Sequence, residues 1–205
     1  MEYLIAVTLF AISASATPGP NNLLLMSSGV NFGVRKSVPL LLGICVGFAI
    51  MLLLVGLGFG QLFQRFPELH LIIKCIGTAY LLYLAFLIAR SGEMSGATDE
   101  QAKPLTFLKG ALFQWVNAKA WVVATGAIAA FTSVGDGFYT QNMIIAATFF
   151  FVSFPSVGVW LLFGSMLKKV LTSSTRRKVF NYSMSLLLVL SVLPVVRDIV
   201  FQIMA

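Results

Sequence analysis

The run from Thr17 to Asn22, Thr-Pro-Gly-Pro-Asn-Asn, lies inside an apolar stretch long enough to cross a membrane. A helix cannot continue through two prolines separated by a glycine, because proline lacks an N–H group and restricts the residue before it. At membrane depth, backbone groups freed by such a break are tolerated only inside protein or beside a water-filled cavity. The run therefore predicts a broken helix around an interior site, an arrangement with which many transporters hold their substrates.

The chemistry of this predicted site suits an amino acid. If Pro20 starts the second half of the helix, the N–H groups after it carry the positive end of the helix dipole and can bind a carboxylate. The side chains of Asn21 and Asn22 can reach an amino group or cap the break. The alternative is a structural kink whose asparagines only satisfy the backbone. A kink needs one proline and this run has two, so we favour a ligand site formed by Pro18, Gly19, Pro20, Asn21 and Asn22.

A lysine lies deep inside another apolar stretch. Lys119 follows Asn117 closely, and every Asp and Glu lies in a loop or near the end of an apolar stretch. A charge at this depth is costly unless it pairs, lines water or reaches the interface. Lys119 is therefore left with backbone carbonyls, Asn117 or the carboxylate of a substrate as partners. The alternative is a shifted span in which the lysine extends to the surface. We interpret Asn117 and Lys119 as the opposite wall of the site.

The composition indicates an integral membrane protein. Of the 205 residues, 59% are hydrophobic and only 10% are charged, and the mean hydropathy is +0.93. That leaves too little polar surface for a soluble protein of this size. The net charge of +7 comes from short basic clusters between apolar stretches, so nucleic acid is not expected as a partner. The N-terminus lacks the basic region of a secretory signal, and the first stretch is expected to remain as a span.

Apolar stretches of about 20 residues, the length that crosses a bilayer, occur along the whole chain. The six stretches run from Tyr3 to Val30, Val38 to Gly60, Leu69 to Ala89, Leu105 to Phe131, Thr140 to Gly164 and Val179 to Ile203. The first and fourth are longer than a straight crossing needs and contain polar residues, which indicates broken or tilted helices. We therefore predict an all-α membrane protein with six transmembrane helices, of which the first and fourth are broken or irregular.

The loop charges and the midpoint of the chain predict its topology. Ten Lys and Arg residues lie in the loops after the first, third and fifth stretches, and only three lie in the other loops. Because basic loops mark the cytoplasmic side, both termini are predicted to be periplasmic. The cytoplasmic linker 91–104 separates two halves, 1–90 and 105–205, with three spans each, and an odd span count gives them opposite orientation. This predicts one transporter domain, 1–205, built from two inverted three-helix repeats.

Two sequence blocks carry a resemblance to a known family. They are the Pro-Gly-Pro-Asn run at 18–21, followed by Gly29, Gly33, Arg35, Gly43 and Gly47, and the block Gly-Ala-Leu-Phe-Gln-Trp-Val-Asn-Ala-Lys-Ala at 110–120. The first resembles the opening signature of the LysE/RhtB-type amino-acid exporters, and the second resembles the Asn-Pro-Lys block of that family, with Ala118 in place of proline. The likeness covers essentially the whole chain and is similar to the branch that exports cysteine and O-acetylserine.

The resemblance implies a secondary transporter of the bacterial inner membrane. It implies export of small neutral amino acids or derivatives, cysteine/O-acetylserine or homoserine/threonine-like, by alternating access driven by the proton motive force. The residue that would carry the proton is not evident, because the single histidine, His70, lies at the edge of a stretch. The candidates are Glu68, Asp136, Asp198 and Lys119 itself. Uniport down the substrate gradient is the alternative to proton coupling.

Other classes of function find little support in the sequence. The chain has no zinc-ligand spacing, no Gly-x-Ser-x-Gly elbow and no P-loop, so we predict no enzyme, no metal and no cofactor. The remaining alternatives are a passive amino-acid channel and a membrane subunit whose broken helix docks a partner. The patterns Gly43-x-x-x-Gly47 and Gly56-x-x-x-Gly60 are typical of closely packed helices, either within the chain or in a homodimer.

Overall fold

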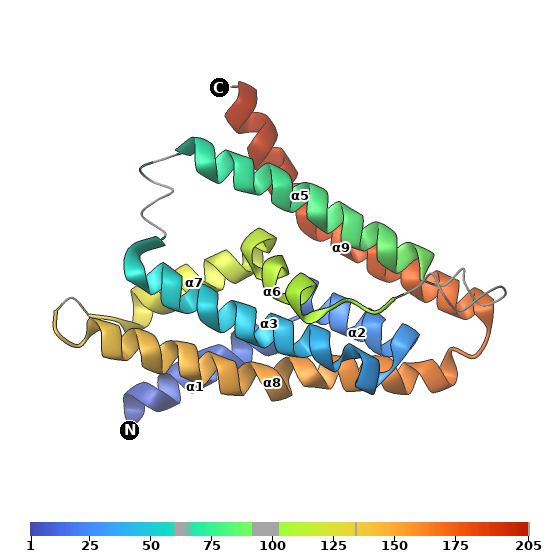
Figure 1. Cartoon of the computed structure of the whole chain (residues 1–205), viewed down its shortest axis with the longest axis horizontal. Coiled ribbons are helices and arrows are strands. Elements are labelled where there is room, and N and C mark those ends of the chain that lie inside the picture. Colours follow the sequence, from blue (N-terminus) through green and yellow to red (C-terminus); the bar gives the residue numbers. More distant parts are fainter. Residues whose placement is uncertain (60–64, 66, 92–102, 134, 205) are drawn as a thin grey trace.

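The computed structural model describes residues 1–59, 65, 67–91, 103–133 and 135–204. This part of the chain forms eight α-helices and one π-helical segment, and it contains no strand (Figure 1). They are α1 (Glu2–Ala16), α2 (Pro20–Phe32), α3 (Val34–Leu54), η1 (Val55–Phe59), α5 (Pro67–Arg90), α6 (Phe107–Val116), α7 (Ala118–Phe131), α8 (Phe138–Val170) and α9 (Ser174–Met204). The prediction of an all-α protein is confirmed for these residues.

Four helical segments of the described chain are long and apolar enough to cross a membrane. They are Val34–Phe59, Leu71–Arg90, Phe138–Val170 and Ser174–Gln202. The pair α1 and α2, bent by 56° at its break, is a fifth candidate if it is counted as one span. The fourth predicted stretch forms α6 and α7, of 10 and 14 residues, and neither is long enough alone. Four or five of the six predicted spans therefore have a candidate membrane-crossing helix among the described residues.

The first helix break falls within the Pro-Gly-Pro run. α1 ends at Ala16 and α2 begins at Pro20, where the missing N–H of proline has no cost. Gly19 is fully extended between them, with φ −174° and ψ −179°. Helical hydrogen bonding resumes when the N–H groups of Asn22 and Leu23 donate to the Gly19 carbonyl, each at 3.0 Å. The two prolines thus separate two helices as the sequence predicts.

The second break falls at Asn117, although an alanine follows it. Asn117 has an extended backbone, with φ −88° and ψ 103°, and α7 starts directly after it. Its side-chain oxygen accepts a hydrogen bond from the N–H of Lys119 at 3.2 Å, which is the bond of an N-cap. A capping asparagine therefore starts the new helix without a proline.

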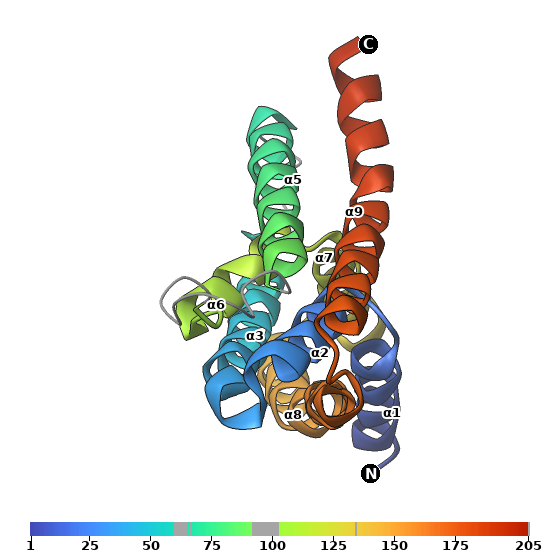
Figure 2. The ribbon, with the colours of Figure 1, turned by 90° about the vertical axis from the view of Figure 1, so that its right-hand side faces the viewer.

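The helices pack as a larger group and a projecting pair. α1, α2, α3, α6, α7 and α8 lie against one another, whereas α5 and α9 run side by side and project away from them (Figures 1 and 2). Phe149 of α8 is fully buried in a cluster with residues of α1, α3 and α7. Leu84 of α5 and Leu188 of α9 pack in a second cluster with Leu24 of α2. Both breaks lie within the larger group, where Pro20 and Asn117 are buried and Thr17, Pro18 and Ala118 are exposed.

The most basic connecting segments lie at one end of the molecule. The start of α3, the end of α5, the start of α6 and the turn between α8 and α9 gather there, while the start of α1 and the turn between α7 and α8 lie at the opposite end (Figure 1). This is the grouping of loops that the sequence predicts for one side of a membrane.

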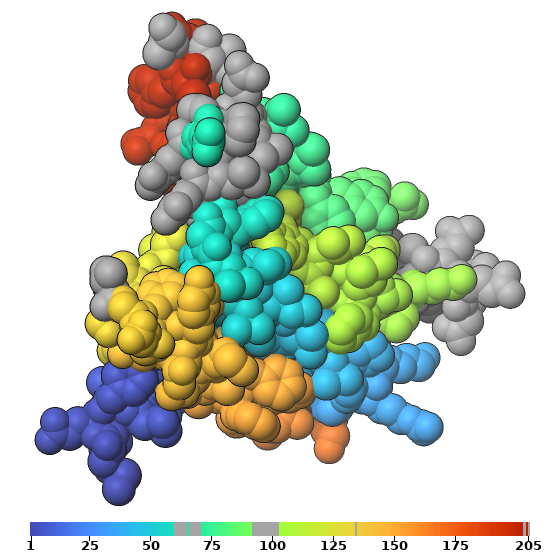
Figure 3. Space-filling model, turned by 60° about the vertical axis from the view of Figure 1, so that its left-hand side comes forward, coloured from blue at the N-terminus to red at the C-terminus, as the bar shows by residue number. Residues whose placement is uncertain are grey.

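The predicted glycine pair of α3, Gly43 and Gly47, packs within the chain. A Cβ at Gly43 would overlap the Phe107 carbonyl of α6, and one at Gly47 would lie 2.6 Å from the Cα of Ala111. α3 and α6 accordingly lie side by side on the surface (Figure 3). Gly56 faces the side chain of Asn142, and Gly60 lies outside the described residues. The face of α3 that holds Gly43 and Gly47 is thus filled by α6, and a homodimer stays a prediction.

A substitution at Gly43 tests this close approach. We expect Gly43→Ala to lower the free energy of unfolding by about 1–3 kcal/mol, because the added methyl group pushes α3 away from α6. Gly126→Ala is the matched control, since no atom lies within 4 Å of the position that its Cβ would take. Alanine favours a helix by roughly 1 kcal/mol over glycine, so the control should be as stable as the parent or more stable. Thermal unfolding in detergent measures both, and equal stabilities would contradict the close packing.

Candidate functional site

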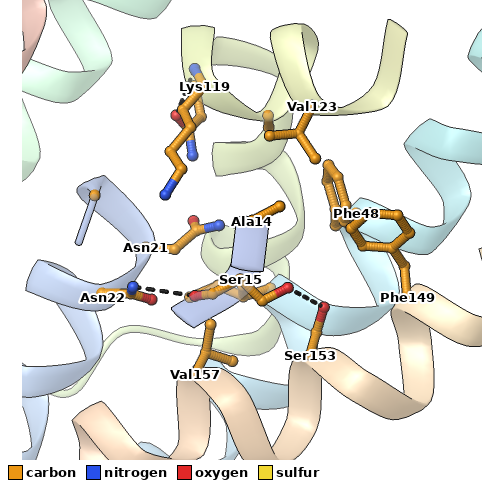
Figure 4. Close-up of a pocket in the computed structure, with 14 residues that line it drawn as sticks. Ala14, Ser15, Asn21, Asn22, Phe48, Lys119, Val123, Phe149, Ser153 and Val157 are labelled. Carbon is orange, nitrogen blue, oxygen red and sulfur yellow. Dashed lines mark hydrogen bonds between the residues drawn. The ribbon is translucent and has the colours of Figure 1, made fainter. Parts of the chain in front are cut away.

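The residues of the two breaks line one interior cavity. It offers about 40 Å³ to the centres of water molecules and lies between α1, α2, α3, α7 and α8 (Figure 4). Its polar lining consists of Ser15, Asn21, Asn22, Asn117, Lys119 and Ser153. A water molecule needs roughly 10–15 Å³ of such space, so in this conformation the cavity has room for a few waters. An amino acid requires it to widen.

Asn22 connects the end of α1 to the start of α2. Its Nδ2 donates to the carbonyl of Ser15 at 3.2 Å and to that of Thr17 at 2.9 Å, which otherwise lack helical partners. The NH₂ group of the Asn22 amide thus caps the break, which is the structural alternative to ligand binding. The oxygen of the amide differs, because Oδ1 is buried and has no hydrogen-bond partner among the described residues. An unpaired acceptor in the cavity wall can receive an N–H or O–H group of a ligand.

Lys119 reaches across from the second break to the first. Its Nζ donates to the Thr17 carbonyl at 2.7 Å, so the ammonium group lies at the first break. The lysine side chain passes directly over Gly19, where a Cβ would lie 2.9 Å from the lysine Cδ. Because glycine has no side chain, it leaves space at this position for the side chain of Lys119. Figure 4 shows the side chain of Lys119 directed toward Asn21 and the broken helix.

Gln114 is a site residue that the sequence reasoning missed. It is fully buried on α6 and forms a reciprocal amide pair with Asn21, with both N–H to O distances 3.0 Å. Its Nε2 also donates to the carbonyl of Gly110 at 3.1 Å. The amide of Asn21, which the sequence assigns to a ligand, is thus occupied by Gln114 in this conformation. A buried glutamine close to Asn117 in an apolar stretch is the signal that could have identified it.

Most of the seven site residues that the sequence predicts line the cavity. Five of the seven, namely Gly19, Asn21, Asn22, Asn117 and Lys119, line the cavity. Pro20 is buried at the start of α2, and Pro18 is exposed, so the prolines shape the break without lining the cavity. The sequence reasoning also missed Ser15 and Ser153, whose hydroxyl groups lie 3.2 Å apart in the wall.

The charge of the cavity comes from Lys119. No Asp or Glu of the described chain lines it, and Asp136 and Asp198 are exposed elsewhere. The side chain of Glu68, also considered as a proton carrier, lies outside the described residues. Within the described residues no group of three or more His, Cys, Asp and Glu could hold a metal. The site therefore combines one cation, one unpaired acceptor and two hydroxyl groups, which suits a small zwitterion.

Comparisons with known proteins agree along most of the chain. Residues 12–196 match the family described as LysE type translocator. The chain is 30% identical over 189 residues to the cysteine/O-acetylserine efflux protein of Escherichia coli strain K12, with 91% of this chain and 93% of that protein covered. It is 31% identical over 191 residues to the protein of the same name from Salmonella choleraesuis, with 91% and 93% covered. No solved structure matches the chain.

Proposed function

Since the chain belongs to the LysE type translocator family, whose members are efflux transporters rather than enzymes, we propose that it exports cysteine, O-acetylserine and similar small neutral amino acids through the cavity between the two helix breaks. Family membership and the apolar helices make the chain a multi-pass inner-membrane protein with a small amino-acid substrate. The proposal adds the substrate, the site and the mechanism.

Lys119 and Asn22 line the same cavity, and this observation is the main support for the proposal. The substrate carboxylate would replace the Thr17 carbonyl as partner of the Lys119 ammonium group, with the N-terminus of α2 beside it. The substrate ammonium group would donate to Oδ1 of Asn22, which is unpaired among the described residues. Both groups of a zwitterion thus find a partner within one cavity.

The walls of the cavity favour a small neutral side chain. Phe48, Val123, Phe149 and Val157 line it opposite the polar groups. A thiol or acetyl group can pack against these apolar atoms. A cationic side chain would meet Lys119 and no carboxylate among the described lining residues. We therefore expect lysine and arginine to be poor substrates.

Alternating access would require breaking the contacts that join the two helix breaks. These are the bond from Lys119 to Thr17 and the amide pair of Asn21 with Gln114. Both join an element of the first half to one of the second half, so moving one half against the other breaks them. We propose that the proton motive force drives this cycle. Lys119 is the sole proton-carrier candidate among the described residues that line the cavity.

The proposed topology places six spans in two inverted repeats within one transporter domain, 1–205. In it α1 with α2 and α6 with α7 form the broken first spans of the repeats, separated by the linker 91–104. The gathering of the basic segments at one end of the molecule supports a cytoplasmic assignment for that end and periplasmic termini (Figure 1).

Efflux from proteoliposomes tests the proposed function. Vesicles containing the purified protein are loaded with labelled cysteine, O-acetylserine, homoserine, threonine, leucine, lysine or arginine. We expect saturable efflux of the small neutral members and counterflow, accelerated by an imposed proton gradient. Protein-free vesicles give the background. Efflux without saturation would indicate the channel, and no efflux from correctly inserted protein would favour the docking subunit.

A further inference from the structure

A second and larger cavity lies between α2, α5 and the start of α6. It has a volume of about 310 Å³ and lies at the end of the molecule where the basic segments gather. Arg90, Lys103 and Lys109 line it, and no Asp or Glu of the described chain does so. Three cations around one hollow repel one another and concentrate anions there. This cavity is separate from the cavity at the helix breaks, with which it shares no lining residue.

Aromatic rings hold two of these cations beside the cavity. The guanidinium carbon of Arg90 lies 5.4 Å from the centre of the Phe86 ring, and Nζ of Lys109 lies 6.0 Å from the centre of the Tyr83 ring. Both distances are within the range of cation–π contacts. Phe86 and Tyr83 line the cavity and are about half exposed on α5, at 52% and 46%. They form a rim that faces outward from a helix apolar enough to cross a membrane.

The inner part of the cavity is partly polar and partly apolar. Ser27 and Ser28 of α2 line it and are at most 5% exposed, and the Ser28 hydroxyl is bonded to that of Ser37 at 2.7 Å. The Ser27 hydroxyl accepts a bond from Nδ2 of Asn31 at 3.4 Å, so its own proton can be donated. Leu84 and Leu87 of α5 provide an apolar wall beside them. The cations and the Ser27 hydroxyl group suit a phosphate, and the apolar wall suits a hydrocarbon chain.

We propose that this cavity binds the phosphate head group of an anionic phospholipid. Arg90, Lys103 and Lys109 neutralise the phosphate, and the acyl chain lies along the exposed apolar face of α5. Free phosphate offers the same head-group chemistry, but it would leave the apolar wall and the aromatic rim without a partner. Basic pockets between membrane-spanning helices are recognised sites for anionic lipid head groups. The occupant is therefore a lipid rather than a soluble ion.

Lipid binding to the purified full-length protein tests the proposal. Phosphatidylglycerol and phosphatidylcholine with identical acyl chains are titrated into the protein in detergent, and bound lipid is counted by native mass spectrometry. We expect wild type to retain phosphatidylglycerol preferentially. The double variant Arg90→Gln/Lys109→Gln should lower its apparent affinity by about 30-fold, roughly fivefold for each charge. The double variant Lys168→Gln/Lys169→Gln is the control, because it removes equal charge at the exposed end of α8.

Each outcome decides the proposal. A loss confined to Arg90→Gln/Lys109→Gln, with an unchanged unfolding temperature in lipid-free detergent, supports it. No preference in wild type, or an equal loss in the control variant, would overturn it in favour of diffuse surface charge. Displacement of the lipid by an equal concentration of inorganic phosphate would assign the cavity to a free anion and also overturn it. The measurement needs no transport, so its failure is distinct from a failure of the proposed export.

Discussion

Replacing Lys119 with methionine is expected to lower the efflux of cysteine at subsaturating concentration by about 10–100-fold. A hydrogen bond to a charged group contributes roughly 1.5–3 kcal/mol, and each 1.4 kcal/mol corresponds to about a factor of ten. Methionine keeps a similar length and fills the space over Gly19, but it cannot donate to a carboxylate. Initial rates of efflux from proteoliposomes measure the effect. Lys168→Met, at the exposed end of α8, is the matched control and should retain full activity.

A substrate analogue separates binding from capping. Lys119 also caps the Thr17 carbonyl, so a loss of activity alone could follow from a weakened break. Cysteamine lacks the carboxylate of cysteine but keeps its amine and thiol. Wild type should therefore bind cysteine far more tightly than cysteamine, whereas Lys119→Met should discriminate between the two much less. Stabilisation against thermal unfolding by each compound gives these affinities, and unchanged discrimination in the variant would show that Lys119 is only structural.

The breaks could be predicted from the sequence because their causes are local. Proline lacks an N–H whatever surrounds it, so the end of α1 and the start of α2 follow from Pro18 and Pro20 alone. The second break depends on Asn117, whose side chain caps α7 from within the same turn. Ala118 stands where the family block has proline, and this would suggest a weaker break only if proline caused the break. The capping asparagine explains why the break persists.

The partners across the cavity could not be predicted, because they depend on how distant helices pack. The sequence lists backbone carbonyls among the partners of Lys119, but it cannot select the carbonyl of Thr17 from the other half of the chain. The same limit hid Ser15 and Ser153, which are ordinary helical serines until α1 and α8 bring them together. It also hid Gln114, whose pairing with Asn21 spans 93 residues. Residue type identified the candidate groups, and tertiary packing decided which of them meet.

The amide pair of Asn21 and Gln114 leads to the second large prediction. Gln114→Leu removes two reciprocal hydrogen bonds and leaves the amide of Asn21 without this partner beside the cavity. We expect the free energy of unfolding to fall by about 1–3 kcal/mol, since each of the two hydrogen bonds contributes about 0.5–1.5 kcal/mol. Because the pair joins the start of α2, at the first break, to the end of α6, at the second break, its loss should also shift the balance between closed and open states by a similar energy. Efflux should fall about tenfold, since each 1.4 kcal/mol corresponds to about that factor.

A second amide pair in the same protein provides the control. Asn31 and Asn181 bond reciprocally between α2 and α9 at 2.9 and 3.0 Å, and neither residue lines the cavity at the breaks. Asn181→Leu breaks a pair of the same chemistry and should cost similar stability in thermal unfolding. If the Asn21–Gln114 pair acts in the transport cycle, Asn181→Leu keeps its efflux while Gln114→Leu loses it. Equal loss in both variants would mean that the pair contributes to stability alone, and the closing of the breaks would then depend on the bond between Lys119 and the Thr17 carbonyl.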